Sequence, residues 1–384
     1  MSIDTFLLPD FQTCLRYSVQ TKRNFICIAK RIMKAEEKQT DKKNPRSAPH
    51  ADVEPIPSME DDIKLAAERD EPPAIQLQRA IHHHQIGDKL VLRSSLLKKD
   101  FAEHLHQKSS HHEPGLEIVI IPNINDIPIR DQGSLVRWMR DSAVENAPRI
   151  FIGLLQWDPT KEETCSGETE SRAGTKRDSS KVPYEKHLQS KLKINDWLRH
   201  KFWFACSMPK SDSINSSLSS GYFSEAESLT DMGAKDIVRK QRIGDLGYSE
   251  VHIEPSLRRY VLDVMVHLRI HRLTVHGKGG GVHTGCLEDI LTLAQLMCLD
   301  DNKEFVTPRE IKQAMRWYFP VHLMLITNPL LDTSILYGSK IRLIDEFLSK
   351  VARMKQQKSL ELENPLILES LVVQDVLSKV VPPI

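Results

Sequence analysis

Two continuous apolar segments on either side of an amphipathic helix constrain the first half of this chain more than any other feature. Residues 116–121 read LEIVII and residues 149–155 read RIFIGLL. A run that is apolar at nearly every position is typical of a strand buried on both faces, as in a parallel sheet. Between them, Asp131 begins a helical pattern that includes Leu135 and Trp138. Because parallel strands require a crossover connection, this order predicts a βαβ unit.

Further elements are expected around this unit. Residues 10–33 are predicted to form one helix, because the apolar residues of this segment recur near a helical period. A short helix is expected at 75–84 and a strand at 89–92. Residues 188–205 contain NDWLRHKFWFA, which is too apolar for a loop, and they are predicted to pack against the sheet.

From residue 255 onward the pattern is helical without interruption. The segment SLRRYVLDVMVHLRIHRL carries one apolar stripe, which consists of Leu257, Val261, Val264 and Leu268. Thr307, Pro308 and Glu310 predict a helix start, with threonine at the N-cap, proline at the first helical position and glutamate closing a capping box. Helices are also expected at 286–299 and 340–351. The apolar tail from residue 370 is expected to dock, with the N-terminal domain as one candidate surface.

Three polar stretches divide the chain. Each is poor in large apolar residues and cannot repay the entropy of ordering, so each is predicted to be a linker or a surface insertion. The predicted division is an N-terminal helix at 1–34, a disordered linker at 35–74, an α/β domain at 75–206 with a surface insertion at 158–181, a serine-rich acidic linker at 207–248, and a helical domain with a C-terminal tail at 249–384.

Composition restricts the partners and the compartment. The chain has 53 Lys and Arg residues against 52 Asp and Glu, so no overall field draws it toward nucleic acid or an anionic membrane. The six cysteines form no CxxC pair, which indicates free thiols in a reducing compartment. No run reaches the roughly 20 apolar residues of a membrane span. An intracellular protein without a membrane partner is expected.

A nucleotide site is not expected. A phosphate loop of the form GxxxxGK[ST] needs two glycines and a lysine, whereas the first 114 residues contain only Gly87. The glycine run at 277–281 follows a helix and lacks the Lys-Ser/Thr ending, so a turn between helices is predicted there. The apolar strand at 116–121 runs into Pro122 and Asn123, neither of which supplies a carboxylate. We therefore predict no cofactor.

Metal binding and catalysis are not predicted either. The chain has 16 histidines, with clusters at 82–84, at 104 and 106, and at 111–112. Adjacent histidines on a helix point in different directions, so a solvated surface is preferred over a metal site and no ligand is assigned. Because no Gly-x-Ser-x-Gly or Cys/His signature is present, no catalytic residue is assigned.

The candidate interaction surface has a basic part and an aromatic part. The basic part lies along the helix that follows residue 255 and consists of Arg258, Arg259, Arg269 and Arg272. These side chains could contact phosphates, or they could cover the helix flank and pair with carboxylates such as Asp263. Trp317 and Tyr318 could serve as anchors of a protein interface, and core packing is the alternative explanation for them.

One resemblance covers the second half. RRYVLDVMVHLRIHRL, GGGVHT, the helix from Leu287 and EFVTPREIKQA resemble the helical lid of AAA+ ATPases of the MoxR and magnesium-chelatase type. In that family the glycine turn is followed by a serine, a proline and an arginine that senses the γ-phosphate. Gly285 stands at the position of that arginine here. The resemblance implies a degenerate AAA+-like parallel-sheet domain, followed by a lid-like helical domain that lacks the family's nucleotide chemistry.

A second resemblance spans nearly the whole chain. The blocks LPDFQTCLRYSV, EIVIIPNIN, RIFIGLLQW, WLRHKFWFAC, RWYFPVHL and ENPLILESLVVQDVLSKVVPPI resemble the fungal maintenance of telomere capping protein 2 family. The resemblance implies a role in keeping chromosome ends capped, without an established biochemical activity. The chain departs from that family at Asn123, where an aspartate can occur, and this departure disfavours metal binding at the strand end.

These observations favour a non-enzymatic α/β protein that acts through protein partners, among them chromosome-end or DNA-damage factors. Two alternatives stay open, a cryptic AAA+-like ATPase and a direct binder of single-stranded DNA through the basic helix and the aromatic residues. The oligomeric state and the choice between nucleus and cytoplasm also stay open, because the basic residues at 42–46 are a weak import signal.

Overall fold

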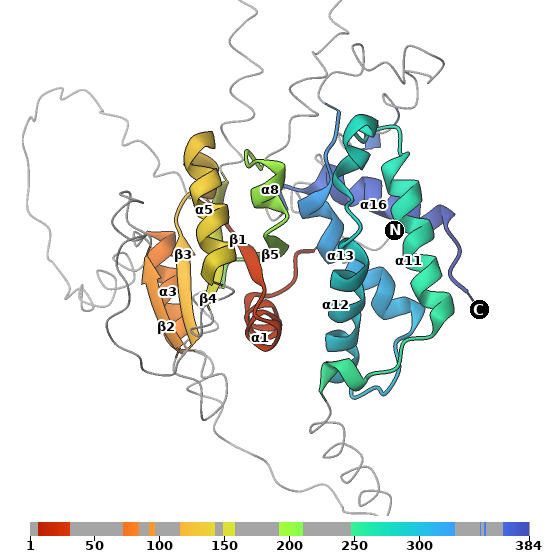
Figure 1. Cartoon of the computed structure of the whole chain (residues 1–384), viewed down its shortest axis with the longest axis horizontal. Coiled ribbons are helices and arrows are strands. Elements are labelled where there is room, and N and C mark those ends of the chain that lie inside the picture. The colour runs from red at the N-terminus through yellow and green to blue at the C-terminus, as the bar shows by residue number, and fades with distance from the viewer. Residues whose placement is uncertain are drawn as a thin grey trace, which may run out of the picture.

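The first half of the chain builds a five-stranded sheet in which all paired strands run parallel (Figure 1). The computed structural model describes residues 7–30, 72–83, 92–96, 116–142, 149–157, 192–209, 247–326, 346, 349–350 and 364–383. The strand order is β2-β3-β4-β1-β5. The strands are β1 (Asn24–Lys30), β2 (Leu92–Leu96), β3 (Leu116–Ile121), β4 (Arg149–Trp157) and β5 (Phe202–Ser207). The α/β class and the βαβ unit predicted from β3 and β4 are confirmed.

The N-terminal segment is a helix followed by a strand, so the single helix expected over 10–33 was wrong. Helix α1 (Phe11–Thr21) ends where Lys22 adopts the left-handed conformation, with φ of 55°. The following strand β1 pairs with β4 on one side and with β5 on the other. Its residues from Phe25 to Ala29 are all buried. A fully apolar run is the mark of a buried parallel strand, and its approximate helical spacing was misleading.

Helices cover both faces of the sheet. Helices α1 and α3 (Pro73–His83) share a core with Phe25 and Cys27 of β1. Helices α5 (Ile129–Ser142) and α8 (Asp196–Arg199), with the short 3-10 helix η2 (Ile124–Asp126), contribute residues to the core on the opposite face, which includes Ile26 and Ile28. The two cores follow the alternation of side chains along a strand.

Two boundaries in the first half differ from expectation. The strand expected at 89–92 is β2, at Leu92–Leu96. The aromatic segment expected to pack against the sheet supplies its edge strand, because β5 pairs directly with β1.

The second half is helical, as predicted. Its helices are α11 (Pro255–Arg269), α12 (Cys286–Asp300), α13 (Pro308–His322) and α16 (Ile367–Lys379), with the 3-10 segments η3 (Tyr248–Glu250) and η4 (His276–Gly281). The capping box of Thr307 and Glu310 is present at the start of α13. The tail docks as expected, and α16 packs mainly on α13 and α11. Its neighbour Leu366 reaches the core under α5 and α8.

The helical part packs against the open flank of the sheet (Figure 1). Helix α13 lies on β5, and the larger apolar core runs without interruption from the sheet into the helices. Polar contacts add to this packing: the Tyr17 hydroxyl donates to Asp300 at 2.5 Å, and Arg23 pairs with Asp289 at 3.0 Å. The division into five segments stays a prediction, because the expected linkers, the insertion and most of the helix expected at 340–351 lie outside the described residues.

Candidate functional site

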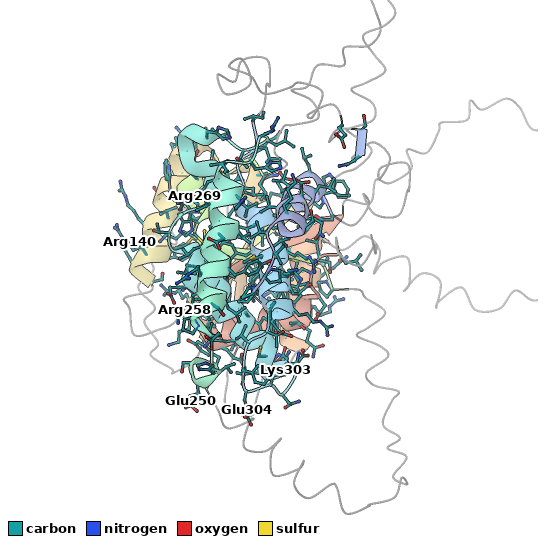
Figure 2. The ribbon with its side chains drawn as sticks, turned by 90° about the vertical axis from the view of Figure 1, so that its right-hand side faces the viewer. Arg140, Glu250, Arg258, Arg269, Lys303 and Glu304 are labelled. Carbon is teal, nitrogen blue, oxygen red and sulfur yellow. The ribbon has the colours of Figure 1, made fainter. Side chains whose placement is uncertain are left out.

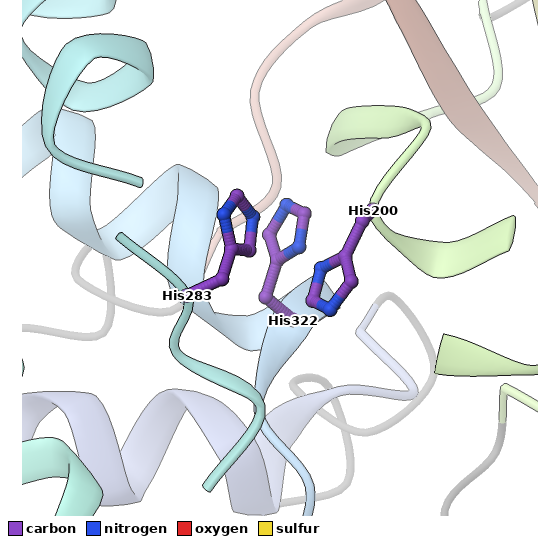
Figure 3. Close-up of side chains that lie close together, drawn as sticks. All are labelled: His200, His283 and His322. Atoms are coloured by element: carbon purple, nitrogen blue, oxygen red, sulfur yellow. The ribbon is translucent and has the colours of Figure 1, made fainter. Parts of the chain in front are cut away.

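Three histidines from distant parts of the chain meet at the junction between the sheet and the helices (Figure 3). His200 follows α8 and precedes β5, His283 lies between η4 and α12, and His322 ends α13. One ring nitrogen of each lies within 4.8 Å of those of the other two. We call these residues the histidine trio. His322 is fully buried, and the other two are half-buried.

The glycine run brings His283 to this junction. Gly281 has φ of 81°, and a Cβ atom there would lie 2.1 Å from the His322 carbonyl oxygen. Only glycine combines that backbone conformation with so close an approach. The Gly280 carbonyl accepts from the Met324 amide at 3.0 Å, which fastens the run to the segment after α13. The predicted turn between helices is confirmed, and it holds His283 beside His322.

A buried arginine fixes the other side of the junction. Arg199 is 5% exposed, and its guanidinium donates to the carbonyls of Leu192, Val321 and Leu323 at 3.2, 3.4 and 2.9 Å. The last carbonyls of a helix have no partner within the helix, so Arg199 satisfies acceptors at the end of α13. The backbone that carries His200 is thereby tied to the backbone that carries His322.

Hydrogen bonds assign the tautomer of His322. Its Nε2 lies 3.2 Å from the Trp203 carbonyl oxygen, which can only accept, so Nε2 carries the proton. The lone pair is therefore on Nδ1, and Nδ1 is buried without a hydrogen-bond partner among the described residues. The ring stacks on Tyr318 with centroids 4.1 Å apart.

Hydrogen bonds through Tyr318 also orient His283. The Tyr318 hydroxyl donates to Asp289 Oδ2 at 3.0 Å and lies 3.4 Å from His283 Nε2. With the hydroxyl proton directed at the carboxylate, Nε2 of His283 is the donor to the tyrosine oxygen. Nδ1 of His283 then holds the lone pair. His200 likewise has a buried Nδ1 without a hydrogen-bond partner in the described part of the chain.

The environment keeps the trio neutral. Burial, together with the neighbouring His283, lowers the pKa of His200 to about 4. Burial also lowers the pKa of His283, and it holds the pKa of His322 well below the ordinary range. Neutral imidazoles present lone pairs, which is the form that ligates metals. The trio can therefore act as a set of nitrogen ligands at neutral pH.

Sequence reasoning missed this trio. It considered histidines that are adjacent in the chain, whereas His200, His283 and His322 come together only through the fold. The blocks GGGVHT, which contains His283, and RWYFPVHL, which contains His322, were identified only as parts of family resemblances. No periodicity or spacing links the three residues, so only the tertiary structure identifies them as a group. The clusters at 104–106 and 111–112 lie outside the described residues.

Three of the four predicted arginines, Arg258, Arg259 and Arg269, belong to α11, and Figure 2 shows Arg258 and Arg269 on this helix. Arg272 was expected on the same helix, but it lies in the turn after α11 ends at Arg269. Arg258 pairs with Glu288 at 3.6 Å, and Arg269 Nε donates to the Val282 carbonyl at 2.9 Å. Arg259 and Arg272 are exposed. Two of the four side chains therefore have contacts within the protein, and the other two face solvent.

The predicted aromatic residues lie elsewhere. Trp317 on α13 is half-buried, with ring centroids 6.5 Å from Tyr17 and 6.4 Å from Phe204. Tyr318 is 0% exposed and contacts the histidine trio. The structure does not bring these residues together with the arginines. Core packing, the alternative explanation, accounts for both.

An apolar stripe on the outer face of α11 was not predicted. Leu262 and Val266 of α11 and its C-cap residue Ile270 are 45%, 51% and 63% exposed, and they are spaced four residues apart. Residues at this spacing lie above one another on a helix. The buried stripe of Leu257, Val261, Val264 and Leu268 faces the core as predicted. We call the exposed set the α11 stripe.

At the end of β3, the chain turns through Pro122 and Asn123, and Asn123 has φ of 49°. Asp126 belongs to η2, beyond that turn. The segment that follows β1 lies outside the described residues, so the absence of a nucleotide site stays a prediction. Among the helices that the structure describes, none combines the length and apolarity needed to cross a membrane.

The fold and the trio define a parallel α/β protein with an attached helical part and a buried polar junction. A family model described as "Maintenance of telomere capping protein 2, N-terminal domain" matches residues 9–207. Maintenance of telomere capping protein 2 from Saccharomyces cerevisiae (strain ATCC 204508 / S288c) is 37% identical over 392 residues, covering 98% of this chain and 99% of the relative. The chain therefore belongs to the maintenance of telomere capping protein 2 family, as its sequence blocks predicted.

Two further comparisons mark the range of similarity. The protein of the same name from Zygosaccharomyces rouxii is 41% identical over 290 residues, covering 75% of this chain and 80% of the relative. A solved structure of a provisionally assigned ATPase from Cytophaga hutchinsonii has a TM-score of 0.37 and 10% identity, with 91% of each chain covered. A likeness this distant carries no argument, so the relation to AAA+ ATPases stays a prediction.

Proposed function

We propose that this chain is a non-enzymatic protein that helps to maintain telomere capping through contacts with other proteins. The names of its relatives supply the pathway. The observation that carries the mechanism is the α11 stripe, three large aliphatic side chains in a row that are left about half exposed by the fold. Single exposed apolar residues are ordinary, whereas a contiguous set on one helix face is characteristic of an interaction site.

The stripe has the chemistry of a helix-docking surface. Burying a large aliphatic side chain contributes about 1.5–3 kcal/mol, so covering the exposed halves of Leu262, Val266 and Ile270 contributes about 2–4 kcal/mol in total. An amphipathic partner helix with anchors at matching spacing would cover all three. The exposed Arg259 and Arg272 flank the stripe and favour acidic residues at the rim of the partner.

The same surface is poorly suited to single-stranded DNA. Such binding combines phosphate contacts with bases stacked on exposed aromatic rings. Tyr318 is buried and Trp317 is packed against Tyr17 and Phe204, so neither offers a free ring face beside the arginines. Arg258 and Arg269 already contact Glu288 and the Val282 carbonyl. These facts favour a protein partner, such as a chromosome-end or DNA-damage factor in the nucleus.

Two described features disfavour nucleotide hydrolysis: the end of strand β3 and the glycine run at 277–281. The strand β3 leads into Pro122 and Asn123, so no carboxylate directly follows it to hold magnesium. The glycine run already packs against the end of α13, where Gly281 lies against the His322 carbonyl. Calorimetry with magnesium and ATP tests this part of the proposal, and micromolar binding would contradict it.

The test of protein binding compares matched surface variants. Wild-type protein, the double variant Leu262→Glu/Val266→Glu and the control Ile129→Glu are used to capture proteins from nuclease-treated cell extract, with identification by mass spectrometry. Ile129 is 69% exposed on α5, so the control adds a carboxylate far from the stripe. We expect a shared set of chromosome-end factors with wild type and control, and its loss with the double variant. Equal recovery by all three would contradict the proposal.

Direct DNA binding is tested in parallel. A gel shift with single-stranded DNA at several salt concentrations is run on wild type and on the charge reversal Arg258→Glu/Arg259→Glu. We expect no salt-sensitive shift with either protein. A shift that falls steeply with salt and is lost in the variant would favour DNA as the ligand of this face.

A further inference from the structure

The histidine trio concentrates lone pairs that no described group satisfies. Nδ1 of His322 and Nδ1 of His200 are buried without hydrogen-bond partners in the described part of the chain. A buried acceptor that lacks a partner costs about 1–3 kcal/mol. A leucine or methionine would fill the same volume without that cost. Two buried ring nitrogens without partners, one of them the lone-pair nitrogen of His322, lie in a group with a third imidazole, and this arrangement suits a ligand that accepts lone pairs.

A water molecule is an incomplete answer. Water has two protons to donate, so it can satisfy two of the three neighbouring ring nitrogens. A protonated ring fits no better, because a second N–H on His322 would be buried without an acceptor among the described residues. A metal cation accepts a lone pair from each imidazole at once, and three histidines are a recurrent ligand set for zinc.

The rings are also oriented as metal ligands are. A ligating histidine nearly always donates its other ring N–H to a carbonyl or carboxylate, which fixes the ring and raises its basicity. His322 donates Nε2–H to the Trp203 carbonyl at 3.2 Å. His283 contacts Tyr318, whose hydroxyl donates to Asp289 at 3.0 Å. Both relays leave Nδ1 free for a metal.

We propose that His200, His283 and His322 together bind one divalent transition-metal ion of the zinc class at the junction of the sheet and the helices. Imidazole suits zinc, copper, nickel and cobalt, whereas magnesium and calcium prefer carboxylate and carbonyl oxygens, which the trio does not offer. Three protein ligands leave a fourth position, which water or a further side chain can fill.

The geometry requires a modest closure. Zinc–nitrogen bonds of about 2.0–2.1 Å at tetrahedral angles place the ligand nitrogens about 3.3 Å apart. The nitrogens of the trio lie within 4.8 Å of one another, so side-chain rotations of His200 and His283 bring them into range. Both rings are half-buried, and His283 follows a glycine run, so they have more freedom than His322.

Charged side chains near the trio act on its affinity for a metal cation in both directions. The cations Arg199 and Arg269 are close enough to affect the pKa of members of the trio, and they oppose a bound cation. Asp196 and Asp289 act in the opposite direction on His200 and His283. These charges balance in number, so the three nitrogen bonds determine binding. A bound ion ties His200 of the first half to His283 and His322 of the second, and it stabilises that junction by mass action.

The test uses the untagged full-length protein after treatment with a chelator. Zinc and cobalt are added to wild type, to His200→Asn and His283→Asn, and to the control His252→Asn, whose side chain is 71% exposed away from the trio. The readouts are bound metal per chain by elemental analysis, the visible ligand-field bands of cobalt, and the melting temperature. The half-buried His200 and His283 are chosen because asparagine there leaves the core intact, as a circular dichroism spectrum checks.

We expect wild type and control to bind one more equivalent of zinc than either trio variant, with at least a tenfold loss of zinc affinity in each variant. We also expect tetrahedral cobalt bands and a zinc-dependent rise in melting temperature that the trio variants lack. Equal zinc uptake by all four folded proteins would assign the metal to other histidines and overturn the proposal. Absence of any zinc-dependent change in wild type would overturn it as well.

Discussion

The junction and the outer face of α11 depart from ordinary globular packing in opposite ways. At the junction, polar groups are buried: Arg199 is 5% exposed and His322 is 0% exposed. On α11, apolar side chains are left in solvent, with Ile270 63% exposed. Buried polar groups and exposed apolar rows are the two informative exceptions to hydrophobic burial. We infer that the junction holds the molecule together, whereas the α11 stripe is available to a partner.

The largest expected effect is the loss of Arg199. Arg199→Met removes the guanidinium that donates to Leu192, Val321 and Leu323, and it leaves three carbonyls at the junction without that donor. We expect the free energy of unfolding to fall by about 3–5 kcal/mol, measured in urea. The matched control Arg140→Met, on an exposed side chain of α5, should change it by no more than about 0.5 kcal/mol. Similar losses of unfolding free energy in the two variants would show that the contacts of Arg199 at the junction do not stabilise the fold.

Gly281→Ala tests the close approach of the glycine run to α13. The new Cβ would lie 2.1 Å from the His322 carbonyl oxygen, at a backbone φ of 81°. Relief of the clash requires the chain segments to separate, so we expect a loss of about 2–4 kcal/mol of unfolding free energy. Gly277→Ala is the control, since no atom lies within 4 Å of its added Cβ. An unchanged free energy of unfolding in Gly281→Ala would show that the glycine run and the end of α13 are not held together.

A contact between α16 and the segment after α11 should make stability depend on pH. Burial raises the pKa of Asp375, but hydrogen bonds from His271 and Lys379 outweigh it and lower that pKa to about 2. His271 Nε2 lies 3.4 Å from Asp375 Oδ2, which ties α16 to the segment after α11. Because the folded pKa lies below that of the unfolded chain, the contribution is present above about pH 4 and is lost as pH falls toward 2.

Asp375→Asn should therefore cost about 1–2 kcal/mol at neutral pH, and the difference from wild type should vanish between about pH 4 and pH 2. Urea unfolding across this pH range is the measurement. A difference that stays constant with pH would mean that the carboxylate charge is not the source of the stability.

The smallest effect on stability is expected on the α11 stripe. Leu262→Ser and Val266→Ser alter side chains that are 45% and 51% exposed. Because about half of each side chain is buried, each substitution should lower the unfolding free energy by no more than about 1 kcal/mol. The buried residue Val264 is the internal comparison, because Val264→Ser on the opposite side of the same helix should cost several times more. A large loss at Leu262 would mean that the stripe supports the fold.

Local patterns predicted the elements that carry their own signal. LEIVII, RIFIGLL and the capping box at Thr307 each specify one element, and each was found in place. Strand β1 was mistaken for the continuation of α1, because its apolar residues fit a helical period and a fully buried strand alike. The glycine run was correctly predicted to be a turn, although the reason for its close approach to His322 appears only in the structure.

The candidate sites were less predictable than the fold. Arg258, Arg259 and Arg269 lie on α11 as predicted, whereas the prediction was wrong for Arg272, which lies in the turn after that helix. The contacts of Arg258 with Glu288 and of Arg269 with Val282 depend on tertiary packing. Tyr318 was considered for a surface and is buried beside His322. The α11 stripe was within reach of sequence reasoning, since Leu262, Val266 and Ile270 repeat every four residues. The histidine trio was not, because nothing local links its members.

The role of the α11 stripe is tested most directly in cells whose only copy of the gene carries Leu262→Glu/Val266→Glu, by measuring single-stranded DNA at chromosome ends. Ile129→Glu is the matched control, and protein levels are compared to confirm folding. We predict exposed chromosome ends in the double variant at wild-type protein level, with intact capping in the control. Intact capping in both would contradict a role for the α11 stripe in telomere maintenance.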